Sequence, residues 1–332
     1  MANLIKTFIC LFDSLALAGY GSITAMVYLS TLIPELKDMA SHGKTRDTNK
    51  LSQSPTVTKG ALDFLVHGDF LMIKKKHFGQ FYIVGLLVLT ATLWLATTMR
   101  TSPTAPSLMV ASIVLLYLHL FRRLYECMFV HKWKDTSVMH IAGYLVGAIH
   151  YVWLPMVFVR LPCEACLREI LGEGIVPSIF YSQYNSGPLW VENASLPPLV
   201  WRLPPILLCL WGQYQQHKHH VLLADMRKPE QSTNTATAAG NSKDKSATKY
   251  SLPSGGWFQY VTCPHYLAEI LVYVSFAILL AQEQVLGVRH FVVLFWVASN
   301  LTLSALINFN WYKRNLPADV MKGRKAIFPF VF

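Results

Sequence analysis

The sequence predicts an all-α integral membrane protein with about seven transmembrane helices, and three observations support this fold class. Of the 332 residues, 53% are hydrophobic and only 14% are charged, whereas about one quarter of the residues of a soluble domain are charged. The apolar residues occur in long runs, near the roughly 20 residues that a helix needs to cross a bilayer. Lysine and arginine are concentrated in alternate connections between these runs.

Seven apolar runs are candidate membrane spans. The first is too long for the apolar region of a signal peptide and lacks a clear cleavage site, so we expect it to be a retained span. The third and fifth are short and need flanking semi-polar turns to cross the bilayer. The runs are Leu4–Ile33, Phe81–Met99, Leu108–Phe121, Ile141–Val159, Leu199–Gly212, Tyr266–Gln282 and Phe291–Ile307.

The basic residues predict the orientation of the chain, because positively charged loops resist translocation. One set of alternate connections holds all but six of the 29 Lys and Arg residues. We expect this set to face the cytosol, which leaves the amino terminus in the lumen and the carboxyl terminus in the cytosol. The triplet Asn193-Ala194-Ser195 agrees, since it is a glycosylation acceptor in a loop assigned to the lumen. The other six basic residues are Lys6, Arg100, Arg160, Arg168, Arg202 and Arg289.

The cysteines and histidines do not indicate a metal site. Cys163 and Cys166 form a Cys-x-x-Cys pair, but a zinc site usually needs a second pair, so a local disulfide or idle thiols fit better. The histidines between residues 217 and 220 have no cysteine or carboxylate at ligand spacing. We therefore expect no bound metal.

The stretch 229–249 is rich in small and polar residues and reads as a disordered cytosolic insert within a single membrane domain that covers residues 1–332. Just before it, Gln216, His220 and Arg227 fall on adjoining turns of a helix, where they could face one polar, phosphate-bearing ligand. The alternative is that they extend toward anionic lipid headgroups.

Two further polar groups lie in or beside apolar runs. His265 and Glu269 are four residues apart on one helix face, and ionisable residues inside a membrane indicate function unless they merely tie helices together. Asn308 and Tyr312 follow the last apolar run. A basic, aromatic tail with a proline follows them.

The residues 252–332 resemble the carboxyl-terminal signature of the steroid 5α-reductase family. The ordered pieces are Leu-Pro-x-Gly-Gly-x-Phe-x-Tyr-Val, x-Tyr-Leu-x-Glu, Trp-Tyr and Arg-Lys-Ala-Ile-x-Pro-Phe. Two upstream stretches, Lys75–Tyr82 and Arg122–Cys127, resemble the polyprenol reductase branch. His42-Gly43-Lys44-Thr45 is similar to a Tyr-Gly-Lys element of the family, with His in place of Tyr.

The resemblance implies an oxidoreductase of the endoplasmic reticulum membrane that uses NADPH to reduce the α-isoprene double bond of polyprenol, or of polyprenal, to give dolichol for protein glycosylation. It implies a cofactor pocket on the cytosolic side, with membrane lipids around the substrate and no nucleic acid or obligate protein partner. No Gly-x-Gly-x-x-Gly turn follows a strand, so side chains would bind the cofactor. The matching positions are Gln216, His220, Arg227, His265, Glu269, Asn308 and Tyr312. Arg227 is the candidate for the phosphate charge, because a guanidinium pairs with two oxygens.

The chain departs from the family at several positions. His265 stands where Asn is frequent, and Phe309 and Asn310 replace a usual His and Arg. Leu120 occupies the position of the tyrosine proton donor of steroid reductases, with His119 beside it, so the sequence disfavours a steroid substrate.

Hydride reduction of a carbon–carbon double bond needs an acceptor for the negative charge. An unsaturated aldehyde provides one as an enolate, whereas an allylic alcohol does not, so we expect the aldehyde to be the form that is reduced. Hydrogen-bond donors and a proton source would complete the site. The candidate catalytic residues are His119, Glu126 and Tyr312, although Glu126 could equally form a helical ion pair with Arg122.

Three rival hypotheses remain open. A trans-2-enoyl-CoA reductase would need additional cationic residues for coenzyme A. A 3-oxo-steroid 4-ene reductase would share the fold and cofactor. A seven-span receptor would use the polar membrane residues to line a ligand pocket, but it has no need for the basic, aromatic carboxyl terminus.

Overall fold

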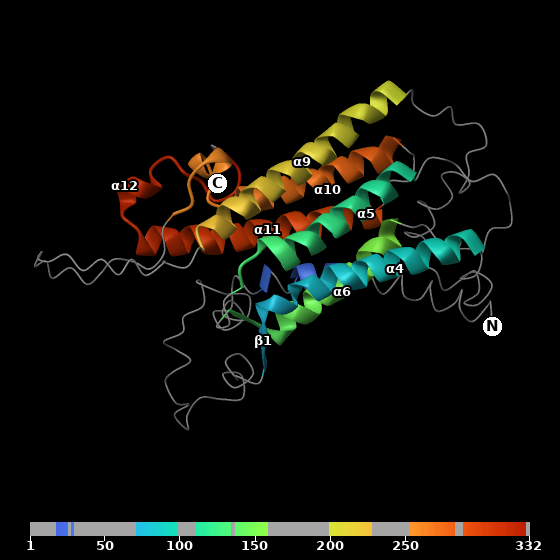
Figure 1. Cartoon of the computed structure of the whole chain (residues 1–332), viewed down its shortest axis with the longest axis horizontal. Helices are drawn as coiled ribbons and strands as arrows, with labels where there is room; N and C mark the ends of the chain where they lie inside the picture. The colour runs from blue at the N-terminus through green and yellow to red at the C-terminus, as the bar shows by residue number, and fades with distance from the viewer. Residues whose placement is uncertain are drawn as a thin grey trace, which may run out of the picture.

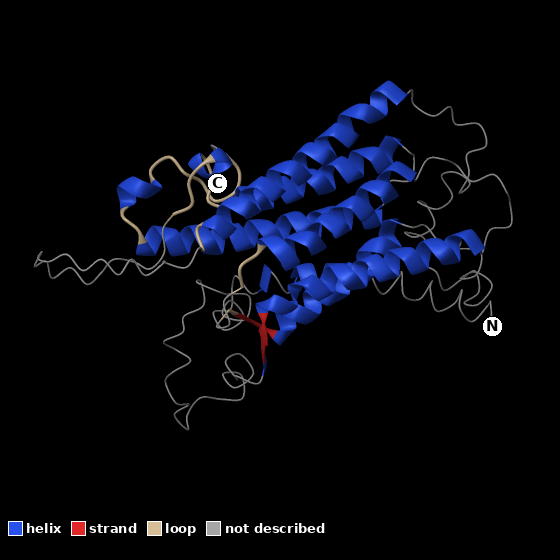
Figure 2. Cartoon of the chain, in the orientation of Figure 1, coloured by secondary structure: helices blue, strands red, loops and turns tan. Residues whose placement is uncertain are grey.

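The computed structural model describes residues 18–25, 28–29, 71–98, 110–133, 137–158, 199–227, 252–282 and 288–329. These residues are mainly helical (Figure 1, Figure 2). Each of the seven apolar runs overlaps a helix. The long helices are α4 (Gly79–Thr98), α5 (Val110–Tyr125), α6 (Ile141–Phe158), α9 (Leu199–Asp225), α10 (Pro264–Gln282) and α11 (Val288–Asn315), and residues 18–25 are also helical. The short turns are η3 (Lys75–Phe78), η4 (Glu126–Val130), η5 (Gly256–Gln259) and α12 (Ala318–Met321).

Several features noted in the sequence lie outside the described residues. They are the Cys163 and Cys166 pair, the Asn193 acceptor, the stretch 229–249 and the element at residues 42–45.

The long helices run side by side in an elongated bundle (Figure 1). α10 packs most extensively against α9 and also contacts α11, while α4 packs against α5 and α6. Gly212 allows the close approach of α9 to α10, because a Cβ atom there would lie 3.1 Å from Val272 Cγ2 and 3.2 Å from the Ala268 carbonyl oxygen. Fully buried leucines and aromatic residues fill the space between the helices, among them Leu89, Leu116, Leu154, Phe276 and Leu279.

Prolines mark several helix ends. α10 begins at Pro264, whose fixed φ suits the first turn of a helix. α11 ends at Asn315, two residues before Pro317, which disfavours helical backbone in the residue before it. Pro155 lies inside α6, and such prolines are tolerated in a membrane bundle because neighbouring groups satisfy the freed carbonyl.

One short pair of strands departs from the all-α prediction. β1 (Met72–Lys74) pairs antiparallel with β2 (Val138–His140), with Met72 opposite His140. Three-residue strands are too short to show the alternating pattern by which strands are recognised in a sequence. The pair joins the segment before α4 to the segment before α6.

The carboxyl-terminal tail is bonded to the start of α10. The Thr262 amide donates to the Lys325 carbonyl (2.9 Å), the Cys263 amide to the Ala326 carbonyl (3.2 Å), and the Lys325 amide to the Tyr260 carbonyl (2.9 Å). Ile327 is fully buried. The early part of the carboxyl-terminal signature, at residues 260–263, and its last part, at residues 325–326, therefore form one unit at the end of the bundle where α10 begins.

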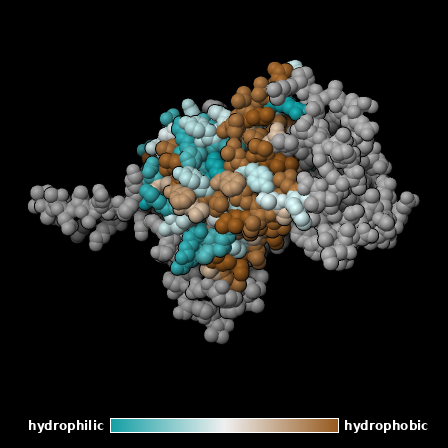
Figure 3. Space-filling view, turned by 45° about the vertical axis from the view of Figure 1, so that its right-hand side comes forward, coloured by the Kyte–Doolittle hydropathy of each residue, from teal (hydrophilic) through white to brown (hydrophobic). Residues whose placement is uncertain are grey.

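The outer surface of the bundle is apolar, as lipid contact requires. Among the residues that the structure describes, four helical segments are long and apolar enough to cross a membrane: Lys75–Trp94, Ile141–Phe158, Pro264–Gln282 and His290–Asn315. Large side chains such as Leu87, Trp94 and Phe291 are more than half exposed. Figure 3 shows a band of hydrophobic residues beside a region where hydrophilic residues gather. These findings support an α-helical membrane protein, whereas seven spans and the side that faces the cytosol remain predictions.

The fifth predicted span lies within one long helix. α9 continues from Leu199 to Asp225, well beyond the predicted end at Gly212, and its second half remains packed in the bundle, where Gln216 and His220 are 3% and 5% exposed. These two side chains therefore do not extend toward lipid headgroups.

Candidate active site

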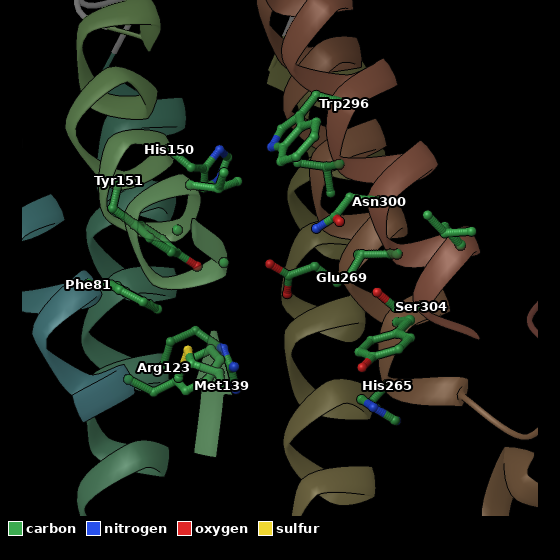
Figure 4. Close-up of a pocket in the computed structure, with 18 of the residues that line it drawn as sticks. Phe81, Arg123, Met139, His150, Tyr151, His265, Glu269, Trp296, Asn300 and Ser304 are labelled. Atoms are coloured by element: carbon green, nitrogen blue, oxygen red, sulfur yellow. The ribbon is translucent and has the colours of Figure 1, made fainter. Parts of the chain in front are cut away.

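A cavity of about 410 Å³ lies inside the bundle. In Figure 4, Phe81, His150 and Tyr151 on one wall face Glu269 and Asn300 on the other. Apolar side chains make up much of the lining, among them Met139, Val146, Trp296, Val297 and Leu301. Polar side chains lie along its length in Figure 4, from His150 through Asn300 and Glu269 to His265, and we call the end with Arg123 and His265 the polar end.

α10 presents a polar stripe to the cavity. His265, Glu269 and Tyr273 are spaced four residues apart, so they lie on one face of the helix on successive turns. All three line the cavity. The helix face predicted to carry His265 and Glu269 thus lies on the cavity wall, and the same face extends one turn farther to Tyr273.

Glu269 connects three helices. Gln216 Nε2 on α9 donates a hydrogen bond to Glu269 Oε2, and His119 Nε2 on α5 lies 3.3 Å from Glu269 Oε1. The Gln216 side-chain oxygen Oε1 accepts a hydrogen bond from Arg122 on α5. An amide suits this position, because it donates to a carboxylate while accepting from a guanidinium.

Glu126 is the centre of a buried ion-pair cluster. The π-helical turn η4 begins at Glu126, and the His131 amide donates to its carbonyl over 2.8 Å. Arg122 and Arg123 each pair with one carboxylate oxygen. His217 Nδ1 and His220 Nδ1 lie 2.9 and 2.8 Å from these oxygens. The expected pair between Arg122 and Glu126 is thus present, and Glu126 is not among the residues that line the cavity.

Arg123 joins this cluster to the cavity. Its Nε donates to the Tyr82 hydroxyl over 3.0 Å, and both side chains line the cavity. Because a guanidinium stays charged at any pH that the fold tolerates, Arg123 places a permanent positive charge at the polar end, although its pairing with Glu126 offsets much of that charge.

Three possible metal ligands meet beside the cluster. One ligand atom each from Glu126, His131 and His220 lies within 4.8 Å of the others. Burial, and then repulsion from His220 and Arg123, lower the pKa of His131 to about 3, so this imidazole is neutral at pH 7. However, the Glu126 oxygens already pair with two guanidinium groups. A divalent cation would meet these positive charges, which disfavours a metal here.

The structure brings together four of the seven predicted cofactor contacts. Gln216 and His220 on α9, and His265 and Glu269 on α10, line the same cavity. His119 is fully buried behind Glu269 and is not among the lining residues.

The remaining predicted residues lie away from this cavity. Arg227 is exposed just after α9, and its guanidinium donates to the Lys132 carbonyl over 3.1 Å. On α11, the Asn308 amide donates to the Ser304 carbonyl over 2.8 Å, and Tyr312 is 4% exposed. Neither Asn308 nor Tyr312 is among the residues that line the cavity.

Several cavity residues were not singled out from the sequence. Tyr82, His150 and Tyr273 line the cavity together with Arg123. His150 carried a usable signal, because an ionisable residue inside an apolar run is expensive and tends to be functional. Tyr273 could have been found by extending the stripe of His265 and Glu269 by one turn.

The polar end of the cavity fits a nicotinamide dinucleotide. His265 Nδ1 is buried and has no hydrogen-bond partner among the residues that the structure describes. A buried polar atom left unpaired is costly, so this nitrogen is suited to pair with a ligand. Gln216 and His220 add amide and imidazole groups beside it, which match the amide, hydroxyl and phosphate groups of such a cofactor.

Comparisons with known proteins agree with this chemistry. The model of the 3-oxo-5-alpha-steroid 4-dehydrogenase family matches residues 157–332, which is over half of the chain. A polyprenal reductase of Caenorhabditis elegans is 30% identical over 79% of this chain and 80% of its own length. Polyprenal reductase 1 of Oryza sativa subsp. indica is 25% identical over 89% and 88%, and the polyprenal reductase of Homo sapiens is 28% identical over 66% and 58%. The chain is therefore an oxidoreductase of the 3-oxo-5-alpha-steroid 4-dehydrogenase, or steroid 5α-reductase, family, and belongs to its polyprenol reductase branch.

Proposed function

We propose that this protein uses NADPH to reduce the α-isoprene double bond of polyprenal, giving the saturated aldehyde from which dolichol for protein glycosylation is made. The observation that carries this proposal is the cavity, whose lining combines many apolar side chains with polar groups from α9 and α10. An isoprenoid chain suits the apolar walls, since its transfer from water is favourable. The names of the three relatives above support the aldehyde as the substrate.

The aldehyde also satisfies the electronic demand of the reaction. Hydride addition to the β-carbon of an enal moves negative charge onto the carbonyl oxygen, where hydrogen-bond donors can stabilise it. An isolated allylic alcohol has no such acceptor. If polyprenol is turned over at all, it must first be oxidised to polyprenal.

Gln216, His220 and His265 would hold the cofactor at the polar end of the cavity, with Glu269 close to the reacting groups. The cofactor supplies hydride when bound. Arg227 remains the proposed partner of the cofactor phosphate, because it is a cation just beyond α9, the helix that carries Gln216 and His220. Asn308 and Tyr312 remain proposed contacts for parts of the cofactor that extend beyond this cavity.

We also place the protein in the endoplasmic reticulum membrane, with a lumenal amino terminus and a cytosolic carboxyl terminus. The concentration of basic residues in alternate connections supports this orientation. Attaching a glycosylation tag to each terminus in turn tests it in cells. Glycan on the amino-terminal tag alone is expected, and glycan on the carboxyl-terminal tag alone would reverse the orientation.

The substrate is tested with purified protein in lipid nanodiscs, supplied with NADPH and one of four compounds. These are polyprenal, polyprenol, a 3-oxo-4-ene steroid and a trans-2-enoyl-CoA, with products identified by mass spectrometry. We expect a gain of two hydrogen atoms with polyprenal only. Reduction of polyprenol without a carbonyl intermediate, or of the steroid or the thioester in preference to polyprenal, would contradict the proposal.

A further inference from the structure

A chain of three hydrogen-bonding side chains crosses the bundle and ends at the cavity. The Tyr20 hydroxyl lies 2.9 Å from His150 Nδ1, and His150 Nε2 lies 3.2 Å from the Tyr273 hydroxyl. Tyr20, His150 and Tyr273 are 1%, 9% and 4% exposed. They come from the helix at residues 18–25, from α6 and from α10, and both His150 and Tyr273 line the cavity. Three helices that are distant in the sequence are therefore linked by one buried chain of hydrogen bonds.

We propose that the Tyr273 hydroxyl binds the carbonyl oxygen of an α,β-unsaturated isoprenoid aldehyde and stabilises the enolate that forms there. His150 is a positioning residue that fixes the direction of this hydroxyl, and Tyr20 in turn fixes His150. The proposal rests on the proposed function and specifies where the aldehyde end of the substrate binds.

The order of the hydrogen bonds determines which proton is available to a ligand. The Tyr20 hydroxyl also donates to the His150 backbone carbonyl over 3.2 Å. When His150 carries its proton on Nε2, the Tyr20 proton is shared between this carbonyl and Nδ1, and Nε2–H donates to the Tyr273 oxygen. The Tyr273 proton is then free to point into the cavity. Aligned hydrogen bonds also polarise one another in a low-dielectric interior, so this arrangement strengthens Tyr273 as a donor.

The location of His150 and Tyr273 suits the aldehyde end of an isoprenoid. His265, Glu269 and Tyr273 descend along one face of α10, and eight residues of helix correspond to about 12 Å. His265 marks the end assigned to the cofactor, so Tyr273 lies two turns farther along α10, in a cavity whose lining also includes Val297 and Trp296. The substrate oxygen would meet a donor there, while its hydrocarbon chain contacts apolar walls.

The other titratable candidates are less available to a carbonyl oxygen. Glu269 is already engaged, since Gln216 donates to one of its oxygens and His119 Nε2 lies 3.3 Å from the other. As a carboxylate it would repel a developing enolate. Glu126 is enclosed by two guanidinium groups. Tyr312 is not among the lining residues.

The reaction balances as follows. One hydride, supplied by NADPH, which is oxidised to NADP+, forms a C–H bond at the β-carbon. The π electrons of the carbon–carbon double bond shift toward the carbonyl carbon, and the π electrons of the carbonyl move onto oxygen. The Tyr273 hydroxyl donates a hydrogen bond to that oxygen throughout and keeps its own proton. One proton from water then adds to the α-carbon as the carbonyl reforms. The aldehyde thus gains one hydride and one proton.

The test compares Tyr273→Phe, which removes only the hydroxyl, with the matched control Tyr117→Phe. The Tyr117 hydroxyl likewise bridges two helices, through Thr90 at 2.9 Å, but Tyr117 is not among the residues that line the cavity. Loss of one oxyanion donor typically lowers kcat about 10²–10³-fold. We expect a loss in this range for Tyr273→Phe with polyprenal, an unchanged KM for NADPH, and near wild-type values for Tyr117→Phe.

The His150 variants test positioning separately from folding. His150→Gln retains a donor near the Nε2 position, whereas His150→Leu does not. We expect Gln to recover at least tenfold in kcat over Leu at equal thermal stability. If Tyr273→Phe does not fold, the comparison of His150→Gln with His150→Leu tests the proposal. Equal kcat for Gln and Leu, or wild-type kcat for Tyr273→Phe, would overturn the proposal.

An infrared measurement separates failure of this inference from failure of the proposed function. The carbonyl stretch of bound farnesal, a short isoprenoid aldehyde, should lie at lower frequency in wild type than in Tyr273→Phe, because a hydrogen bond weakens the C=O bond. This shift requires no turnover, so it supports the subsite even if wild type fails to reduce polyprenal. Identical frequencies in the two proteins would exclude the subsite even if polyprenal is reduced.

Discussion

Gln216 on α9 donates a buried hydrogen bond to Glu269 on α10, although the two residues are 53 positions apart in the chain. Both line the cavity. Gln216 also accepts from Arg122 on α5, so one amide fixes a carboxylate and a guanidinium at the polar end of the proposed active site.

Replacing Gln216 by leucine should destabilise the protein. The leucine side chain is close in size, but it removes the hydrogen bonds to Glu269 Oε2 and Arg122 Nη2. Arg122 keeps its pair with Glu126 and Glu269 keeps His119 nearby, but a buried unsatisfied group costs about 1–3 kcal/mol. We expect a lower thermal midpoint of the purified protein and weaker NADPH binding. Tyr214→Leu on the exposed face of the same helix is the control. Equal midpoints for the two variants would mean that the bridge contributes nothing to stability.

Glu126→Gln tests whether Glu126 is structural or catalytic. The substitution leaves Arg122 and Arg123 without their counter-charge, and breaking a buried ion pair costs about 3–5 kcal/mol. We expect a strongly lowered thermal midpoint, with activity falling in proportion to the folded protein that remains. Asp319→Asn on the exposed turn α12 should have little effect. A variant with the wild-type midpoint but no turnover would instead make Glu126 a catalytic group.

Gly143→Leu should narrow the cavity without disturbing the bundle. Gly143 lines the cavity, and a Cβ atom there would meet no atom within 4 Å. The added side chain competes with the isoprenoid for space, so we expect the KM for polyprenal to rise about tenfold, or 1.4 kcal/mol, with the KM for NADPH unchanged. Gly21 has equally open surroundings and is not among the lining residues, so Gly21→Leu is the control. An unchanged KM for polyprenal in Gly143→Leu would place the substrate elsewhere.

His265→Phe should weaken cofactor binding more than it affects folding. The imidazole Nδ1 has no hydrogen-bond partner in the described part of the chain, so its loss breaks no bond seen in the structure. We expect the dissociation constant of NADPH to rise about tenfold, which corresponds to one hydrogen bond. The readout is the rise in thermal midpoint with NADPH, since a ligand that binds only the folded protein stabilises it. His77→Phe is the matched control, and equal NADPH affinity in both variants would remove His265 from the cofactor site.

The sequence predicted those parts of the site that depend on helical periodicity alone. His265 and Glu269, and Gln216 and His220, are each four residues apart, and both pairs line the same cavity. The carboxyl-terminal signature likewise indicated the family before any fold was known. Within a helix, spacing in the sequence determines which side chains share a face.

Contacts between distant helices could not be predicted in this way. Tyr20 and His150 are 130 positions apart, and no pattern in either segment indicates that they meet. Arg227 follows the end of α9, where helical spacing no longer determines direction, and it lies away from the cavity. The burial of the second half of α9 could not be predicted in this way either, because its residues are polar and hydropathy alone does not reveal that they pack inside the bundle.

The position of a transferred deuterium tests the central claim most directly. Purified protein is supplied with polyprenal and NADPH that carries deuterium at the transferable position, and the product is examined by NMR. Reduction of the α-isoprene double bond predicts one deuterium on the β-carbon and an intact aldehyde. Deuterium on the carbonyl carbon, with the double bond retained, would show that the protein reduces the aldehyde itself and would contradict the account.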